Sequence, residues 1–316
     1  MAKEAEYAIE VEKLTKRYGE LLAVDDISFN VRKGEVFALL GPNGAGKTTT
    51  VEIIDTIRTP TSGKASILGM DVTKRKHEIV PRIGVLPQGF SSFDRITVRE
   101  TIQYFSRLFC CRKTDVDGLI GLVNLTDKAQ EQYKNLSGGL MQRLGIAIAL
   151  VNDPEVLFLD EPSTGLDPRA RREVWKLLLG LKNKGKTVFL TTHYMEEAEF
   201  LADTVAIISK GKIIAMGSPD ALIESNANYL VLTLKPVDEK AIEIVRTMGF
   251  EPVHDNHEDI KVRVEHMDDV QKILNTIKDG GALLLSLDVR KPNLEEVFLK
   301  LTGEALRKNP AGGVAE

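Results

Sequence analysis

The sequence contains little cysteine and no long apolar stretch. Cys110 and Cys111 are its only cysteines, and they are adjacent. A disulfide scaffold needs more cysteines and a metal site needs another spacing, so we expect ordinary packing residues in a reducing compartment. No run approaches the roughly 18 apolar residues that span a bilayer, and residues 1–13 lack the apolar core of a secretory signal. We therefore expect any role at a membrane to come through a partner.

The sequence also lacks an excess of charge of one sign. The formal net charge is −4, from 42 Lys and Arg against 46 Asp and Glu. This balance argues against a general affinity for nucleic acid or for an anionic membrane. Hydrophobic residues make up 43% of the chain, enough to bury cores, which excludes wholesale disorder. A chain of 316 residues is long for one core and predicts two domains.

Strand and helix patterns alternate as far as about residue 220. Residues 7–40 are rich in strand formers, and residues 97–151 are mostly helical, with Thr97 and Glu100 in a capping-box pattern. The alternation that follows predicts an α/β fold around a parallel sheet. Strands are predicted at 36–40, 65–68, 156–159, 187–190, 205–208 and 212–215. Helices are predicted at 47–57, 115–123, 168–183 and 194–201.

The pattern changes near residue 225. From there the order is strand, helix, strand, strand, helix, strand, which is typical of a small α+β domain of the ferredoxin-like type. Strand patterns lie near 229–234, 261–265 and 282–289, and helical patterns lie near 239–248, 267–278 and 293–301. The expected organisation is a first domain at 1–223, an accessory domain at 224–304 and a disordered tail at 305–316.

A glycine-rich turn follows the apolar run at 36–40. Residues 41–48 match the phosphate-binding loop G-x-x-x-x-G-K-[ST]. Glycines let backbone N–H groups crowd around an anion, and the helix that follows adds the positive end of its dipole. Lys47 is expected to reach the outer phosphates, and Thr48 is expected to place its hydroxyl on Mg²⁺.

A second apolar strand, at 156–159, ends in two acids, Asp160 and Glu161. Ligands bind at the carboxyl ends of strands in open α/β sheets, and successive strand residues point in opposite directions. We expect Asp160 to serve the Mg²⁺ shell and Glu161 to act as general base or to orient the attacking water. The alternative is that both acids merely end the strand.

Ser137, Gly138 and Gly139 open an apolar helix. Such a helix terminus is an anion site, although an ordinary helix N-cap would explain the same residues. Because the chain already has one phosphate loop, a second anion site is useful if it serves an ATP held by another copy.

Together these segments, with 163–167 and 191–193, resemble the ATPase subunit of ABC transporters over about residues 5–220. The resemblance implies a P-loop ABC ATPase fold with a β-rich N-terminal part and a helical subdomain. It also implies further roles. Tyr18 would stack on adenine, and Gln88 would sense Mg²⁺ and the γ-phosphate. Asp167 would lie in a dimer-interface loop, and His193 would contact the γ-phosphate and the attacking water.

The motifs and the resemblance give one set of expected site residues. The expected catalytic residues are Lys47, Gln88, Glu161 and His193. The expected nucleotide-binding residues are Tyr18, Gly41, Pro42, Asn43, Gly44, Ala45, Gly46, Lys47, Thr48, Thr49, Ser137, Gly138, Gly139 and Asp167. The expected metal-binding residues are Thr48, Gln88 and Asp160. One position departs from the family pattern, because Leu140 stands where the family usually has Gln.

The expected cofactors are ATP and Mg²⁺, and the expected assembly is a homodimer, or a pair with a paralogous ATPase, that shares its ATP sites. Residues 191–199, 213–219 and 292–298 resemble one branch, the ATPases of drug, antibiotic and lipid exporters of the daunorubicin-resistance type. That branch implies a separate integral membrane permease and a peripheral location on the cytoplasmic side. In the family, the helical region after Gln88 touches the permease, so exposed apolar residues there would form a docking groove; the alternative is core packing.

Two other classes stay open. One is a non-transport ABC protein that acts on ribosomes or DNA, which usually has two ATPase halves or a long coiled coil, and this chain has neither. The other is a regulatory nucleotide-binding module without turnover, against which Glu161 and His193 argue.

Overall fold

The computed structural model describes residues 6–111, 113–227, 229–237, 239–255 and 259–303. The tail expected at 305–316 lies outside these residues. The chain divides into two compact units, of which the first reaches Pro219 and the second begins at Asp220. Among the helices of the described residues, none is long and apolar enough to cross a membrane.

The first unit is built on a six-stranded sheet with the order β10-β9-β3-β8-β7-β6. Five strands are mutually parallel, and only β10 runs antiparallel to its neighbour. β3, β7 and β8 are buried along their whole length, as their uninterrupted apolar sequences predict. The strands span β3 Val36–Leu40, β6 Ile83–Leu86, β7 Val156–Asp160, β8 Thr187–Thr192, β9 Thr204–Ser209 and β10 Lys212–Gly217. The predicted parallel core is thus confirmed.

An antiparallel sheet with the order β2-β1-β4-β5 packs beside it. Aromatic rings join the two sheets, since the Phe37 ring centroid lies 5.1 Å from Phe29 of β2 and 5.2 Å from Phe189 of β8. All three rings belong to one buried apolar cluster. The strands of this second sheet span β1 Tyr7–Tyr18, β2 Leu21–Arg32, β4 Ser62–Ile67 and β5 Met70–Asp71.

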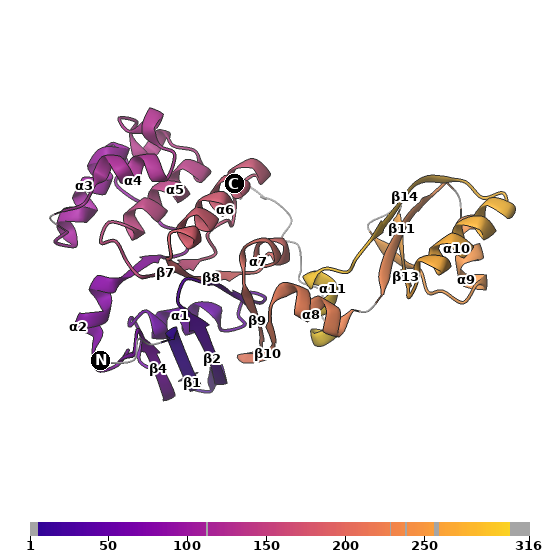
Figure 1. The fold of residues 1–316 in the computed structure, drawn as a ribbon, viewed down its shortest axis with the longest axis horizontal. Coiled ribbons are helices and arrows are strands. Elements are labelled where there is room, and N and C mark those ends of the chain that lie inside the picture. Colours follow the sequence, from indigo (N-terminus) through magenta and orange to yellow (C-terminus); the bar gives the residue numbers. More distant parts are fainter. Residues whose placement is uncertain (1–5, 112, 228, 238, 256–258, 304–316) are drawn as a thin grey trace. The chain divides into compact units, whose positions relative to one another are not determined.

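Helices surround the six-stranded sheet, and α3, α4 and α5 form a separate group in the magenta part of Figure 1. The helices of this unit span α1 Lys47–Ile54, α2 Lys76–Ile79, α3 Val98–Leu108, α4 Val116–Leu122, α5 Gly138–Ala149, α6 Pro168–Asn183 and α7 Met195–Leu201. The capping box predicted for α3 is present, because Thr97 accepts from the Glu100 amide while the Glu100 carboxylate accepts from the Thr97 amide. The predicted bounds of α6 are those observed.

The second unit contains an antiparallel sheet with the order β12-β13-β11-β14. Helices α9 and α10 lie against one face of it (Figure 1) and bury Leu232, Leu234 and Ile273 completely. Its elements span α8 Pro219–Asn226, β11 Leu230–Pro236, α9 Lys240–Thr247, β12 Val253–Asp255, β13 Asp259–Val264, α10 Met267–Asp279, β14 Leu284–Arg290 and α11 Leu294–Thr302.

Candidate functional site

Four neighbouring parallel strands end at the same edge of the six-stranded sheet. The registers pair Leu40 of β3 with Thr192 of β8, and Thr191 of β8 with Asp160 of β7. β6 continues the series beside β7. The segment after each strand contains one predicted site element, namely the Gly41 loop after β3, His193 after β8, Glu161 after β7 and Gln88 after β6. The sheet therefore brings together groups that are far apart in the sequence.

Within the Gly41 loop, position 46 requires glycine for two physical reasons. Its φ of 104° lies in the left-handed region, which other residues rarely adopt. A Cβ at this position would also lie 2.4 Å from the Ala23 carbonyl oxygen. Gly46 is the N-cap of α1, so the loop leads directly into a helix N-terminus whose amide groups point outward.

Lys47 is buried beneath this loop and faces Glu161. Its Nζ donates hydrogen bonds to the Gly41 carbonyl at 2.9 Å and to the Pro42 carbonyl at 3.2 Å. The same atom lies 3.3 Å from Glu161 Oε1. Burial lowers the pKa of Lys47, and the negative charge of Glu161 opposes that shift.

Glu161 is the centre of the cluster. His193 Nδ1 lies 3.2 Å from its Oε2 atom. Gln88 Nε2 and Thr164 Oγ1 both donate to that oxygen at 3.1 Å. Burial raises the pKa of Glu161, but the contact with His193 and the charge of Lys47 outweigh it and lower the pKa to about 2. The carboxylate is therefore ionised at neutral pH and held by donors on three sides.

The backbone at Glu161 is strained. Its φ of 50° is left-handed, which is uncommon for a residue with a side chain. Its N–H donates to the carbonyl oxygen of Thr191 at 3.2 Å and to the hydroxyl of Thr191 at 3.1 Å. Such conformations persist only where the surroundings hold them, and they cluster at functional sites.

Asp160 points toward different partners. Thr48 Oγ1 donates to its Oδ2 atom at 3.1 Å, and the Thr191 hydroxyl donates to Oδ1. One carboxylate and one hydroxyl fit Mg²⁺, which prefers hard oxygen ligands and takes the remainder from phosphates and water. No group of three or more His, Cys, Asp or Glu side chains within the described ranges could hold a metal ion.

The lining of the cavity at this site extends from the phosphate loop to Tyr18. The cavity has a volume of about 600 Å³. Tyr18 is 37% exposed, and its ring lies 5.7 Å from the Arg58 guanidinium. A flat, accessible ring beside a phosphate loop suits an aromatic base. The predicted residues in the lining are Tyr18, Asn43, Gly44, Gly46, Lys47, Thr48, Thr49, Gln88 and Glu161.

Five lining residues were missed by the sequence analysis: Leu21, Leu22, Ala23, Lys210 and Gly211. The turn between β9 and β10 reaches the phosphate loop because the Gly211 N–H donates to the Ala45 carbonyl at 3.0 Å. No local motif marks these positions. Only the pairing of distant strands places this turn against the loop.

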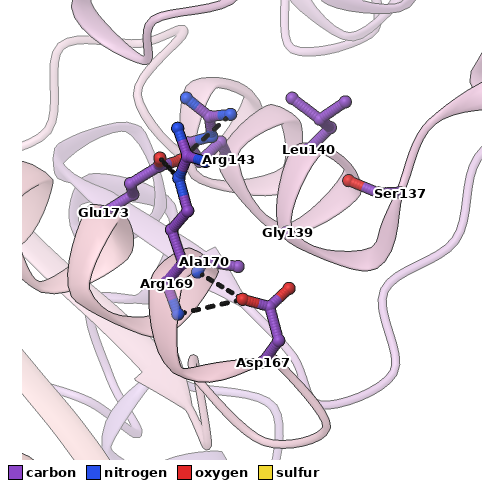
Figure 2. Close-up of a pocket in the computed structure, with 8 residues that line it drawn as sticks. All are labelled: Ser137, Gly139, Leu140, Arg143, Asp167, Arg169, Ala170 and Glu173. Carbon is purple, nitrogen blue, oxygen red and sulfur yellow. Dashed lines mark hydrogen bonds and ion pairs between the residues drawn. The ribbon is translucent and has the colours of Figure 1, made fainter.

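Ser137, Gly139 and Asp167 line a second cavity, of about 220 Å³, which shares no lining residue with the first. Figure 2 shows the Asp167 carboxylate at the start of α6, where Oδ1 accepts from the Arg169 and Ala170 amides, both at 2.9 Å. The predicted residues therefore fall into two groups on one chain.

The start of α5 combines tight packing with an exposed hydroxyl. Ser137 is the N-cap residue of α5, as the N-cap alternative predicts, although its side chain makes no capping hydrogen bond. A Cβ at Gly139 would lie 2.6 Å from the Ala170 Cβ, which explains a glycine there. Gly138 is exposed beside Ser137. Leu140 lines the same cavity, where Figure 2 shows it above Ser137.

Comparisons with known proteins identify the family of this chain. The ABC transporter family model matches residues 24–164. The Nod factor export ATP-binding protein I of Paraburkholderia xenovorans is 41% identical over 308 residues, covering 96% of this chain and 99% of that protein. The daunorubicin resistance ATP-binding protein of Streptomyces coeruleorubidus is 34% identical over 314 residues, covering 97% of this chain and 99% of that protein.

Solved structures show the same fold. CbiO1 from Clostridium perfringens, part of an ABC transporter complex, matches 70% of this chain and 92% of its own with a TM-score of 0.62 and 28% identity. A dimeric ATP-binding cassette in a post-hydrolysis state with ADP and phosphate matches 66% and 98%, with a TM-score of 0.59 and 25% identity. The chain belongs to the ABC transporter family, as an ATP-binding subunit that hydrolyses ATP.

Proposed function

We propose that this chain powers export of a drug, antibiotic or lipid-like compound through a separate integral membrane permease. The observation that carries the proposal is the similarity to two exporter ATP-binding proteins over 96% and 97% of the chain, which includes the second unit as well as the ATPase. The chain itself works at the cytoplasmic side of the membrane, as a peripheral subunit.

Hydrolysis is assigned to the cluster around Glu161. Glu161 orients and deprotonates the attacking water, with His193 and Gln88 positioning the γ-phosphate and the water. While Lys47 faces Glu161, its charge helps to keep the pKa of that carboxyl at about 2. A bound triphosphate competes for Lys47, and the loss of this cation makes Glu161 a stronger base. Nucleotide binding thereby activates the carboxylate.

Nucleotide binding is assigned to the first cavity. Tyr18 stacks on the base, and the N–H groups of residues 41–49 surround the phosphates. Thr48 and Asp160 would hold Mg²⁺, and Gln88, which lines the same cavity as Thr48, would respond to it. Two observations support these three metal-binding residues. Thr48 donates a hydrogen bond to Asp160, and Gln88 lines the first cavity together with Thr48. Bound Mg²⁺ would neutralise charge that develops on the phosphates.

The second anion site is assigned to a partner copy. Ser137, Gly138 and Gly139 of one copy bind the γ-phosphate of an ATP held by the Lys47 loop of the other, and Asp167 lies between them. The separation of the two cavities within one chain supports a homodimer, or a pair with a paralogous ATPase. Hydrolysis splits off the γ-phosphate as inorganic phosphate, its release removes the anion that two positive helix ends share, and the pair opens.

The permease is proposed to bind the surface around α3. Phe93, Tyr104, Leu108 and Phe109 are between 43% and 56% exposed there. The Phe93 and Tyr104 rings contact one another edge to face at 5.2 Å, which keeps them on one patch. A group of exposed aromatic side chains marks an interaction surface.

We also propose that residues 1–223 form the ATPase domain and that residues 224–304 form a ferredoxin-like accessory domain. The support for the fold is the order of elements, strand, helix, strand, strand, helix, strand, with the sheet order β12-β13-β11-β14. A separate apolar cluster inside the second unit supports independent packing.

Purification of the tagged chain from native membranes tests the export proposal. We expect a multi-helix membrane protein to co-purify, and we expect Leu108→Ser to weaken that association because it removes an apolar contact. Val80→Ser is the matched control, since Val80 is 46% exposed and lies outside α3. Recovery of ribosomes or DNA in place of a membrane protein would contradict export.

A further inference from the structure

Glu197 is a fully buried acid that the hydrolysis scheme does not use. It lies on α7, four residues after His193, and it is 0% exposed. A buried carboxyl is costly unless polar groups compensate it. Burial raises the pKa of Glu197, while nearby hydroxyls and the Trp175 indole oppose the shift.

The compensating groups come from three different elements. The Trp175 Nε1–H on α6 donates to Glu197 Oε1 at 3.0 Å. The Ser163 and Thr192 hydroxyls lie at the carboxyl, and Arg171 contributes its charge. Each of Ser163 and Thr192 is 0% exposed, so these groups meet inside the protein and away from solvent screening.

The contact between Glu197 and the segment after Glu161 is incomplete. Ser163 Oγ, Arg171 Nε and Glu197 Oε2 are buried without a direct hydrogen-bond partner within the described part of the chain. They are two donors and one acceptor gathered at one place, and buried polar groups of this kind are rare. The second carboxylate oxygen of Glu197 is therefore an acceptor for which Ser163 and Arg171 offer donors.

The partners of Glu197 are immediate neighbours of the proposed catalytic groups. Thr192 directly precedes His193, and its Oγ1 accepts from the Tyr194 amide at 2.9 Å, which shapes the turn that holds His193. Ser163 follows Glu161 by two residues, in the strained turn. The Arg171 guanidinium lies 4.4 Å from the Tyr194 ring centroid and so links α6 to the same turn.

We infer that Glu197 is a positioning residue for ATP hydrolysis, which ties the Ser163 and Thr192 segments together and thereby sets the geometry between Glu161 and His193. The inference rests on the proposed roles of Glu161 and His193. Glu197 is fully buried and is not among the residues that line the nucleotide cavity, so it acts only through the two segments. Small errors in the placement of reacting groups are costly in rate, whereas the phosphate loop and Tyr18 lie on other elements and should bind ATP as before.

The test measures ATP hydrolysis by the full-length chain carrying Glu197→Gln. Glutamine keeps the side-chain size and one carbonyl oxygen for Trp175, but it cannot accept a bond at the second position. We expect kcat to fall about tenfold with little change in KM for ATP. Glu196→Gln is the matched control, because Glu196 is the adjacent acid on α7 and is exposed; it should hydrolyse ATP at the rate of the unsubstituted chain.

A double-mutant cycle separates positioning from general destabilisation. Ser163→Ala should also lower kcat, and the double variant should be no slower than the slower single one, because both substitutions remove a group from the same buried contact. Multiplied losses in the double variant, or an unchanged kcat in Glu197→Gln, would overturn the inference. If Glu197→Gln does not fold, kcat is measured for Trp175→Phe and Ser163→Ala instead. An unchanged kcat in both variants would overturn the inference.

Glu161→Gln, assayed in parallel, distinguishes a failure of the proposed role of Glu161 from a failure of the inference about Glu197. Normal hydrolysis by Glu161→Gln would remove the proposed role of Glu161, and the inference about Glu197 would fall with it. An inactive Glu161→Gln together with a fully active Glu197→Gln would overturn the inference alone.

Discussion

Single residues determine the chemistry at the end of β7. Asp160 and Glu161 are adjacent, and the alternation of strand side chains predicts different surroundings for each. Their contacts do differ, because Asp160 meets the Thr48 hydroxyl and Glu161 meets Lys47 and His193. The left-handed backbone of Glu161 was not foreseen, since nothing in the neighbouring sequence requires it.

The proposed role of Glu161 predicts a specific loss. Glu161→Gln keeps the size of the side chain and one accepting oxygen but removes the charge and the base, so we expect turnover to fall by at least about 100-fold. ATP affinity should persist because Lys47, Thr48 and Tyr18 are unchanged. Phosphate release measures the loss of turnover, and nucleotide binding on the same preparation measures the retained affinity. Turnover close to that of the unsubstituted chain would exclude Glu161 as the base.

Asp55, which caps the C-terminus of α1, predicts a pH dependence of stability. It is 4% exposed, and burial raises its pKa from 3.8 to about 7. The folded chain therefore holds this proton more tightly than the unfolded chain does. The contribution of protonated Asp55 to the free energy of unfolding is complete below pH 3.8 and is lost as the pH rises to about 7.

Asp55→Asn should remove the loss of stability that follows ionisation of Asp55. Asparagine keeps the oxygen that accepts from the Ile57 amide and carries no charge. We expect the free energy of unfolding to increase by roughly 4 kcal/mol at about pH 8 and to change little near pH 4. Urea unfolding at both pH values measures the difference, with the exposed Asp127→Asn as control. An equal effect at both pH values would rule out the proton linkage.

At the scale of elements, long segments with caps are predictable and short ones are not. The predicted bounds of α6 match because Asp167 caps it and Pro168 begins it. α1 ends at Ile54, three residues before the predicted end, since Thr56 adopts a φ of 75° that a helix cannot continue. β6 and α2 were missed, because four residues are too few to show a period. The predicted order of elements included β12, but its three residues were too few for its bounds to be predicted.

The apolar sequence pattern of α3 does not decide how the surface of this helix is used. Its sequence allows either core packing or an exposed docking surface. In the structure Ile102 is buried, whereas Tyr104 and Leu108 are exposed. The helix therefore has a buried face and an exposed face, and its packing against α4 and α5 decides which face is covered.

At the scale of the whole molecule, the two separate cavities predict complementation between copies. Ser137→Ala and Lys47→Ala should each abolish most turnover when present in every copy. Mixed in equal amounts, they should recover about a quarter of normal turnover, because half of the pairs are mixed and each mixed pair has one complete site. The ATPase rate of a mixture shown to contain mixed pairs provides the measurement. No recovery would count against ATP sites that act independently between two copies.

The sequence by itself determined what depends on a few neighbouring residues: the phosphate loop, the capped helices, the apolar strands and the change of pattern near residue 225. These follow from backbone sterics, capping and periodicity, which act over one or two turns. Tertiary structure alone decided the strand order that brings Gln88 to Glu161, the place of Gly211 against the phosphate loop and the burial of Glu197. These depend on long-range packing, in which a residue's environment is set by segments that its own sequence does not specify.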